Sequence, residues 1–140
     1  MGIVKIPIIS FVKPKLLVLN SDSVKVKIKL RRRTKNHLSS MYFGALAVGA
    51  DVTAGLHAYY FAEQSGVKVS FAFKSVQADF LKRATSDVIF ESNEGKSVEE
   101  VFNEALKTKE RINRFVNVSA LNTEQEEVAT FKMEISVKVK

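Results

Sequence analysis

Alternation of apolar and charged residues marks the clearest strands of the chain. From Val24 to Leu30 an apolar side chain occupies every second position, and a lysine occupies each position between. The stretch from Val128 to Lys140 repeats this period of two, with lysine, glutamate and serine at most of the polar positions. A strand with one buried and one solvated face has this period. Less regular apolar runs bounded by turn residues predict four more strands, over residues 15–19, 67–81, 84–91 and 111–121.

A different pattern runs from Asn36 to Tyr60, the longest stretch of low charge in the chain. Most of it is apolar on nearly every side, and it is rich in glycine and alanine. A helix that is apolar all round is a buried helix, and small residues let a sheet or another backbone come close to it. We therefore predict a buried helix over Ser40–Phe61, with Ser39 or Ser40 as its N-cap and Gly66 at its exit.

A second, shorter helix is predicted from a capping box. Ser97 can accept a hydrogen bond from the backbone N–H of Glu100, and the Glu100 side chain can reach back, which indicates a helix that runs to about Lys109. The order of elements is therefore β-β-α-β-β-α-β-β, and the short turns between the later strands favour antiparallel pairing. We predict one α+β domain over residues 1–140, in which an antiparallel sheet packs one face on the long helix.

Asp51 stands in the middle of the predicted buried helix. A carboxylate there is costly to desolvate unless it is hydrogen-bonded or neutralised. Two explanations stay open from the residues alone: a structural acid bonded to a backbone group or hydroxyl, or a functional acid. His57, six residues further along, falls on a different face of the helix and is expected to be a packed histidine rather than a base.

Composition and charge narrow the classes of protein. The chain has no cysteine and only two histidines, His37 and His57, which fit no metal-binding pattern, so no metal site is expected. The net charge of +7 suggests a polyanionic partner, but the lysines of the predicted strands fall on outward faces and explain much of it. Arg31–Arg33 form a basic cluster. The chain lacks the interleaved aromatic residues of an RNA-binding sheet and any helix-turn-helix pattern, so no nucleic acid is expected.

No targeting or membrane segment is expected. The apolar N-terminal residues 1–19 are interrupted by lysines and prolines, and no small-residue cleavage site follows. The long helix approaches the length of a membrane span, but it carries Asp51 at its middle and small rather than bulky residues. We therefore expect a cytoplasmic protein without a membrane span.

The residues around the long helix resemble the motifs of hot-dog thioesterases similar to the phenylacetyl-CoA thioesterase type. That family has an Asn after its second strand, a His-Gly-Gly at the start of the central helix, and a Leu-Ala-Asp within it. In that family the Asn and the Asp are 15 residues apart. Asn36 and Asp51 of this chain have the same separation. Tyr42-Phe43-Gly44 stands at the place of His-Gly-Gly, and Gly49-Ala50-Asp51 at the place of Leu-Ala-Asp.

A second string, Phe80-Leu81-Lys82-Arg83-Ala84, is similar to the family's Phe-Leu-Arg-Pro-Ala. The resemblance covers about residues 13–140, and it looks closest to an uncharacterised branch that keeps Phe-Gly-Ala-Leu at the helix start. The motif His and first Gly are absent here, as is the Pro. The resemblance implies a hot-dog fold, in which a curved antiparallel sheet wraps around a central helix.

The resemblance also implies an activity, the hydrolysis of an acyl-CoA or acyl carrier protein thioester. The thioester is then a substrate, and no cofactor is expected. Asp51 would act as general base for water or attack directly. Backbone N–H groups of Phe43 and Gly44 at the helix start would stabilise the oxyanion, and Asn36 would position the water or the carbonyl.

Coenzyme A usually enters this fold at a subunit interface, so the resemblance further implies a homodimer or a tetramer. Lys82 and Arg83 would meet the CoA phosphates, although simple solvation explains them equally well. An ordinary turn residue is the corresponding alternative for Asn36. The side chains expected to set the size of the pocket are Phe71, Phe73, Tyr59 and Tyr60. The absent His-Gly pair favours a second hypothesis, a non-catalytic protein that binds an acyl group or acyl-CoA.

Overall fold

The computed structural model describes residues 6–140, which form one six-stranded sheet and three α-helices. The helices are α1 (Pro7–Val12), α2 (Phe43–Ser65) and α3 (Gly95–Thr108), and a short 3₁₀ helix, η2 (Arg32–Thr34), precedes α2. The strands are β1 (Lys15–Leu19), β2 (Val24–Ile28), β3 (Val69–Phe80), β4 (Val88–Ser92), β5 (Ile112–Leu121) and β6 (Glu127–Val139).

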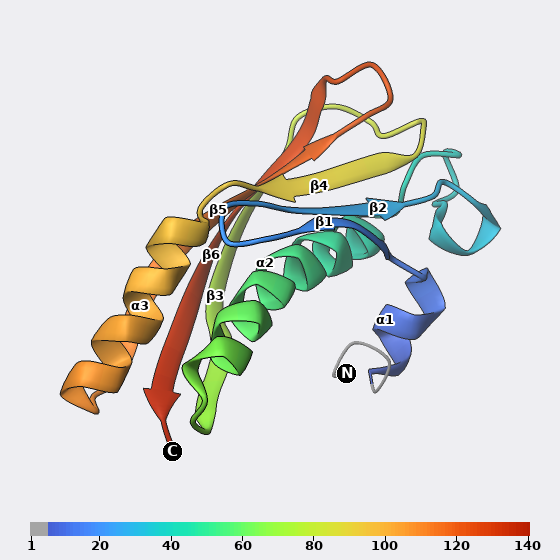
Figure 1. Cartoon of the computed structure of the whole chain (residues 1–140). Coiled ribbons are helices and arrows are strands. Elements are labelled where there is room, and N and C mark those ends of the chain that lie inside the picture. Colours follow the sequence, from blue (N-terminus) through green and yellow to red (C-terminus); the bar gives the residue numbers. More distant parts are fainter. Residues whose placement is uncertain (1–5) are drawn as a thin grey trace.

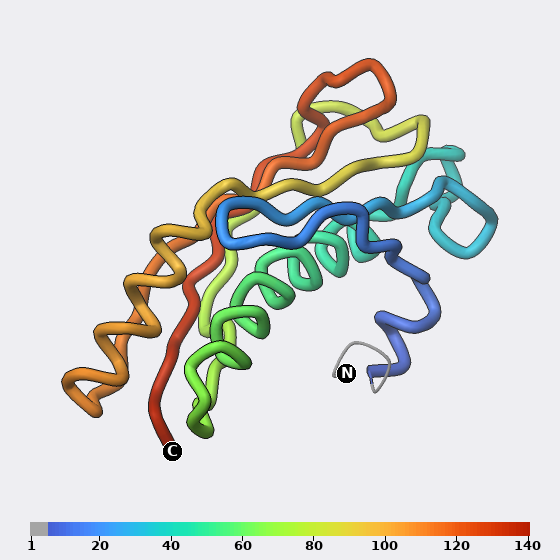
Figure 2. The backbone as a smooth tube through the Cα atoms, viewed as in Figure 1, coloured from blue at the N-terminus to red at the C-terminus, as the bar shows by residue number. Residues whose placement is uncertain are grey.

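All neighbouring strands are antiparallel, in the order β1-β2-β4-β5-β6-β3. The sheet bends around α2, so that β1, β2 and β4 pass across the helix while β3 and β6 descend steeply behind it (Figures 1 and 2). The α+β class, the antiparallel pairing and the wrapping of a curved sheet around one long helix are confirmed. β1 and β3 form the two edges of the sheet.

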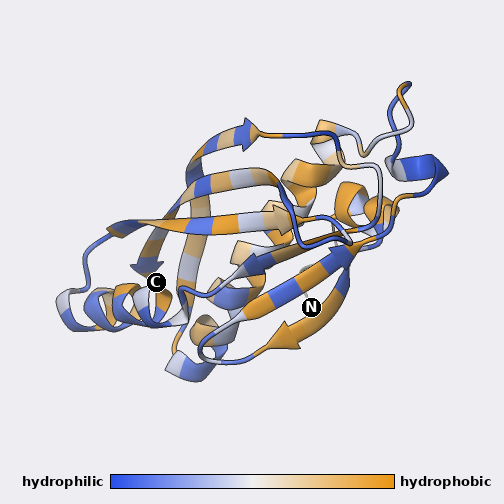
Figure 3. Cartoon of the chain, turned by 90° about the horizontal axis from the view of Figure 1, so that it is seen from above, coloured by the Kyte–Doolittle hydropathy of each residue, from blue (hydrophilic) through white to orange (hydrophobic). Residues whose placement is uncertain are grey.

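Alternation along the strands decides which face is buried. In β2, Val24, Val26 and Ile28 have no exposed surface, whereas Lys25 and Lys27 between them are half-buried. Blue bands cross the orange strands for the same reason in Figure 3. Lys25 and Lys27 form ion pairs with acids of the neighbouring segment, at 3.7 Å from Glu91 and 3.6 Å from Asp87. Part of the positive charge is therefore solvated or paired on the outer face, as predicted.

The small residues of α2 bring the sheet close to the helix. A Cβ built on Gly49 would overlap the ring of Phe90, a fully buried residue of β4. The helix ends at Gly66, whose positive φ of 72° suits a glycine C-cap. Both features agree with the sequence prediction.

The predicted start of α2 is wrong, because no serine caps it. Tyr42 is the N-cap, without a side-chain cap bond. The Ser40 hydroxyl instead donates to Asn36 Oδ1 at 3.1 Å, and Ser39 has a positive φ of 59° that is incompatible with a helix. The serines stabilise the preceding loop rather than the helix.

Two further boundaries differ from prediction. α3 begins at Gly95 and not at a Ser97 capping box, since the Ser97 hydroxyl receives a hydrogen bond from Arg114 at 3.3 Å. β4 begins at Val88 rather than Ala84. The carbonyl of Ala84 accepts the N–H of Met41 at 2.8 Å, so that residue is bonded to the loop before α2 and not to a strand.

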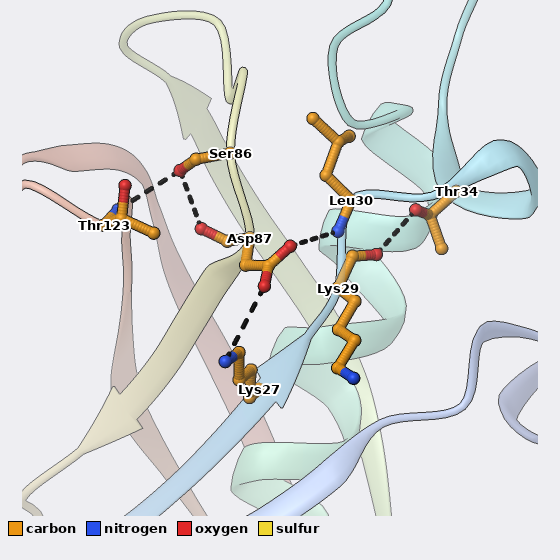
Figure 4. Close-up of polar contacts among 7 residues, drawn as sticks. All are labelled: Lys27, Lys29, Leu30, Thr34, Ser86, Asp87 and Thr123. Carbon is orange, nitrogen blue, oxygen red and sulfur yellow. Dashed lines mark hydrogen bonds and ion pairs between the residues drawn. The ribbon is translucent and has the colours of Figure 1, made fainter.

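A polar network around Asp87 fixes the loop that leads into α2 (Figure 4). The Asp87 carboxylate accepts the N–H of Leu30 at 2.8 Å and pairs with Lys27. The hydroxyl of Thr34, which is almost fully buried, donates to the carbonyl of Lys29 at 2.8 Å. The carbonyl of Thr34 in turn accepts the N–H of Tyr42, the residue that begins α2. The end of β2 is thus tied to the start of the helix.

We expect Asp87→Ala to lower the free energy of unfolding by about 1–2 kcal/mol, because the partly buried Leu30 N–H loses its acceptor. Asp87→Asn keeps an oxygen for that N–H and loses only a partly exposed ion pair, so it should cost less than about 1 kcal/mol. Urea unfolding of the wild type and the two variants measures these losses and shows whether Asp87→Ala costs more than Asp87→Asn. Equal losses in both variants would contradict the assigned role of the Leu30 hydrogen bond.

Candidate functional site

One face of α2 is not covered by the sheet. The residues at four-residue spacing along it, Phe43, Ala47, Asp51, Gly55 and Tyr59, are all exposed or half-buried. The other faces carry the buried residues of the core. The predicted burial of the helix is therefore wrong for this one stripe, and Asp51 lies at its middle.

The open stripe borders an apolar cavity of about 300 Å³. The cavity lies between α2, the edge strand β3 and the segment of α1, and Asp51 is the only carboxylate among the described residues of its wall. Three of the four predicted pocket residues, Tyr59, Phe71 and Phe73, line it, whereas Tyr60 packs on Phe61 instead. The remaining wall residues are Ile6, Ile9, Val52, Gly55, Leu56 and Ala72.

The Asp51 carboxylate has no polar partner within residues 6–140: it forms neither an ion pair nor a hydrogen bond there. Burial beside apolar side chains raises the pKa of Asp51 above its ordinary value of 3.8. Within the described chain, the structural explanation of a bonded acid therefore finds no support. A half-buried carboxylate with a raised pKa at an apolar cavity has the properties of a general base.

The start of α2 offers hydrogen-bond donors. In the described part of the chain the backbone N–H groups of Phe43 and Gly44 have no acceptor, and no side chain caps the helix. The ring of Tyr42 lies against Gly44, where a built Cβ would overlap it. Phe43 is 59% exposed, and its ring contacts those of Tyr42 and Phe80 at centroid distances of 4.8 and 6.1 Å.

Asp51 and these donors are separated along the helix. Gly44 and Asp51 are seven residues apart on the same face, which corresponds to about 10 Å of helix axis. A base and an oxyanion donor that serve one carbonyl must both lie within about 3 Å of the reacting atoms. The two groups of one copy therefore cannot act on the same carbonyl.

The other predicted site residues lie outside the wall of the cavity. Asn36 Oδ1 accepts hydrogen bonds from the Leu38 N–H at 2.9 Å and from the N–H and hydroxyl of Ser40 at 3.2 and 3.1 Å. The side-chain oxygen of Asn36 therefore stabilises its own loop, as the side chain of a turn residue does. Lys82 forms an exposed ion pair with Glu126 at 2.8 Å, and Arg83 is exposed. Their contact with a substrate stays a prediction.

His57 is a packed core residue, as the sequence indicates. It is 1% exposed, its Nε2 lies 3.0 Å from the carbonyl oxygen of Asn20, and its Nδ1 has no hydrogen-bond partner in the described chain. The contact to a carbonyl identifies Nε2 as the protonated nitrogen, which leaves Nδ1 as a buried lone pair. Desolvation lowers the pKa of His57 below its ordinary value of 6.5, although the Asn20 carbonyl and Asp22 oppose that change.

The lowered pKa of His57 predicts a loss of stability in mild acid. Above its ordinary pKa of 6.5 the histidine is neutral in both states and contributes no pH dependence. Below that value the unfolded chain binds a proton that the folded chain does not, so the free energy of unfolding falls until the pH reaches the folded pKa. Urea unfolding between about pH 7.5 and 5 measures this slope.

His57→Gln should flatten the slope, and His37→Gln, at an exposed loop position, should leave it unchanged. An unchanged slope in His57→Gln would contradict the assignment to His57.

A curved antiparallel sheet wrapped around a long helix, with a cavity against the open face of that helix, defines a hot-dog fold protein. The model of the domain of unknown function DUF4442 matches residues 1–139, so the chain belongs to that family. No curated protein matches the chain in sequence.

Solved structures share the fold at low sequence identity. A Pseudomonas aeruginosa protein of unknown function, described as a probable thioesterase, is 18% identical, with a TM-score of 0.81 over 97% of this chain and 89% of its own. A Chlorobaculum tepidum protein of unknown function is 10% identical, with a TM-score of 0.84 over 96% and 88%. A mutant form of a thioesterase enzyme from Staphylococcus aureus is 9% identical, with a TM-score of 0.73 over 95% and 99%. The hot-dog fold is thereby established.

Sequence reasoning missed the part of the wall that comes from the N-terminus. Ile6 and Ile9 reach the cavity because α1 packs on α2. A local signal existed in Pro7, which occupies the first turn of α1, where proline is favoured. The sequence allows either a short helix or an irregular lead-in over residues 3–12; the structure shows a helix over Pro7–Val12, and residues 3–5 lie outside the described part.

Proposed function

We propose that the protein hydrolyses an acyl thioester of coenzyme A or of an acyl carrier protein. One observation carries this proposal: the unpaired carboxylate of Asp51 faces an apolar cavity on the open side of α2. The cavity suits the acyl group. The low-identity structural neighbours that are described as thioesterases agree with this reaction class.

The chemistry follows from the two features of α2. Asp51 takes a proton from a water molecule while the water oxygen bonds to the thioester carbonyl carbon. The carbonyl oxygen becomes an oxyanion, which accepts hydrogen bonds from the free N–H groups of Phe43 and Gly44. The carbon–sulfur bond then breaks, the thiolate leaves and takes up the proton, and a carboxylic acid remains. Direct attack by the carboxylate, through a mixed anhydride that water later hydrolyses, is the alternative route.

A homodimer completes the site in this proposal. The donors and Asp51 of one copy lie too far apart to share a carbonyl, so the donors of one copy must serve the carboxylate of another. The edge strand β3 has no neighbour on its outer side among the described strands. It carries exposed apolar residues, Val76 at 60% and Phe80 at 49%. An unpaired edge of this length favours pairing with a second strand, and two-fold symmetry is the commonest arrangement.

We expect Val76→Asp to halve the molecular mass measured by light scattering and to remove hydrolysis together with it. A charge at an apolar contact of two edge strands opposes their pairing. Phe115→Asp is the matched control, because Phe115 is 46% exposed on β5, an inner strand of the sheet that pairs with β6 along its length. A monomeric wild type that still hydrolyses thioesters would contradict the shared site.

The direct test is a panel of acyl-CoA and acyl carrier protein thioesters of increasing chain length, followed by release of the free thiol. Turnover is expected for at least one acyl group that fits the cavity. No turnover of any thioester by the wild type would remove the proposed activity. The carrier is then assigned from the ratio of kcat/KM for the CoA and carrier-protein forms of one acyl group.

A non-catalytic acyl-binding protein is the second candidate. It is favoured by the aromatic residues at the start of α2, where the Tyr42 ring lies against Gly44 beside the N–H groups needed by the oxyanion. Calorimetry with a non-hydrolysable CoA thioether separates the two functions. Binding of the thioether without turnover of the parent thioester supports the second candidate, and absence of binding removes both.

A further inference from the structure

The net positive charge of the chain arises from its N-terminal part. The first 50 residues contain ten lysines and arginines and a single acid, Asp22, which gives a net charge of +9. The remaining 90 residues contain twelve basic and fourteen acidic residues, which gives −2. The whole excess therefore lies on the segment that forms α1, β1, β2 and η2, and such an asymmetry indicates a polyanionic surface as partner.

The same segment exposes large apolar side chains. Ile6, Ile8 and Phe11 at α1 are 49%, 67% and 57% exposed, and Leu16 and Leu17 at the start of β1 are 43% and 41% exposed. On its other side α1 buries Ile9 and Val12 in the core. The short helix is thus apolar on both sides, one packed on the protein and one facing outward.

Cations surround these apolar residues. Lys13 ends α1 and Lys15 begins β1. Arg33 donates a hydrogen bond to the carbonyl oxygen of Phe11 at 3.3 Å, and its guanidinium lies over the Phe11 ring at 5.0 Å. Arg32 is exposed beside it in η2. None of the four cations has an ion-pair partner within residues 6–140. α1 and the η2 loop lie at one end of the molecule (Figure 1).

We propose that this N-terminal surface, formed by the apolar residues of α1 and β1 and the cations beside them, docks on an anionic lipid surface. Apolar side chains that enter the boundary of head groups and chains, with Lys and Arg at head-group level, are the features of a membrane-surface segment. None of the helices in the described chain is long and apolar enough to cross a membrane, so the protein would lie on the surface.

Two other partners fit less well. Nucleic acid is contacted through polar and cationic side chains, which would leave Ile8 and Phe11 without an apolar partner. A second copy of this chain would bring the surface against its own symmetry mate, and the unpaired cations would then face one another. Anionic lipid satisfies both the apolar and the cationic residues.

Docking is independent of the proposed hydrolysis, since vesicle binding needs no turnover. Docking would nevertheless change the surroundings of the cavity. Ile9 and Ile6 belong both to the segment of α1 and to the cavity wall, so a docked α1 places the wall of the apolar cavity next to the lipid. An acyl group could then pass between the lipid and the cavity with little exposure to water.

Sedimentation with sucrose-loaded vesicles tests the proposal on the full chain. Vesicles of phosphatidylcholine alone are compared with vesicles that also contain the anionic lipid phosphatidylglycerol. Each comparison is made at roughly 0.1 M and 1 M salt, because the electrostatic screening length falls from about 10 Å to about 3 Å between these concentrations. Binding is expected to the anionic vesicles at low salt, with a loss at high salt. Arg32→Glu removes a cation near the lipid surface and should weaken binding by at least about five-fold. Ile8→Asp replaces an inserted apolar side chain by an acid that anionic lipid repels, and it should weaken binding by at least as much.

Two control variants make the same kinds of substitution, apolar to aspartate and cation to glutamate, away from the N-terminal surface. Val67→Asp alters an apolar residue that is 47% exposed at the far end of α2, and Lys138→Glu reverses an exposed charge on β6. Both should bind as the wild type does. Absence of binding to anionic vesicles, or equal losses in all four variants, overturns the proposal. If vesicles are not bound and Ile8→Asp alone lowers the mass in light scattering, a second copy covers α1 instead.

Discussion

Asp51→Asn is expected to reduce thioester hydrolysis by about 10²–10⁴-fold, the usual contribution of a positioned general base, while the protein stays folded. The amide is close in shape to the carboxylate but cannot take the proton from water. Comparison of kcat for the wild type and the variant on the best thioester of the panel measures the loss. Glu100→Gln, at an exposed position on α3, removes the same charge away from the cavity and should keep full activity.

The same substitution should not destabilise the protein. Because desolvation raises the pKa of Asp51 from 3.8, the ionised carboxylate lowers the free energy of unfolding at every pH above its folded pKa. This penalty begins to shrink as the pH falls through the folded pKa, and it is gone below the ordinary value of 3.8. Asp51→Asn should therefore melt at or above the wild-type temperature at neutral pH, and the difference should shrink in acid.

A functional acid and a structural acid give opposite results here. Loss of activity together with equal or greater stability identifies a residue kept for chemistry. A clear fall in melting temperature with full activity would show that Asp51 supports the fold and would remove its catalytic assignment.

Gly49→Ala is expected to lower the free energy of unfolding by about 1–3 kcal/mol, the range for overpacking a filled core. The added methyl group would overlap the ring of Phe90, which has no exposed surface and so no free space to move into. This loss outweighs the gain of up to about 1 kcal/mol that alanine brings over glycine inside a helix.

Gly55→Ala provides the control on the same helix. A Cβ there would meet only the ring of Phe73 at 3.9 Å, an ordinary contact. The helix gain should then prevail, and the variant should be as stable as the wild type or more so. Urea unfolding of both variants decides the matter, and equal effects in the two would show that the close approach of Phe90 does not limit α2. Because Gly55 also lines the cavity, its variant should discriminate against the bulkiest acyl groups of the panel.

The sequence predicted the elements whose signals are local and strong. Period-two alternation located β2 and β6, and the apolar stretch with Gly66 at its end located α2 and its exit. Helix starts were less accurate. Ser40 and Ser97 have the chemistry of caps, but their hydroxyls bond to other side chains, Ser40 to Asn36 of the same loop and Ser97 to Arg114 of β5. Such partners lie far from the helix start in the sequence or in an irregular loop, where no periodicity reveals them.

Part of the cavity wall was predictable as residues but not as an arrangement. Asp51 stood out because a lone acid in an apolar stretch is unusual, and Phe71, Phe73 and Tyr59 were expected around the pocket. Which face of α2 stays open depends on how far the sheet bends, and that is set by strands from the whole chain. The confinement of the open stripe to one side follows from that bend, and the contribution of Ile6 and Ile9 to the cavity follows from the packing of α1 on α2.

The position of β3 in the sheet affects how the chain is made. Its only neighbour among the described strands is β6, and β6 begins at Glu127, long after β3 ends at Phe80. During synthesis β3 therefore leaves the ribosome well before the strand that pairs with it. Both of its edges stay unpaired in that interval, and unpaired apolar strands are prone to aggregate. Lys74 and Asp79 interrupt its apolar residues, and charges on a strand oppose pairing with wrong partners.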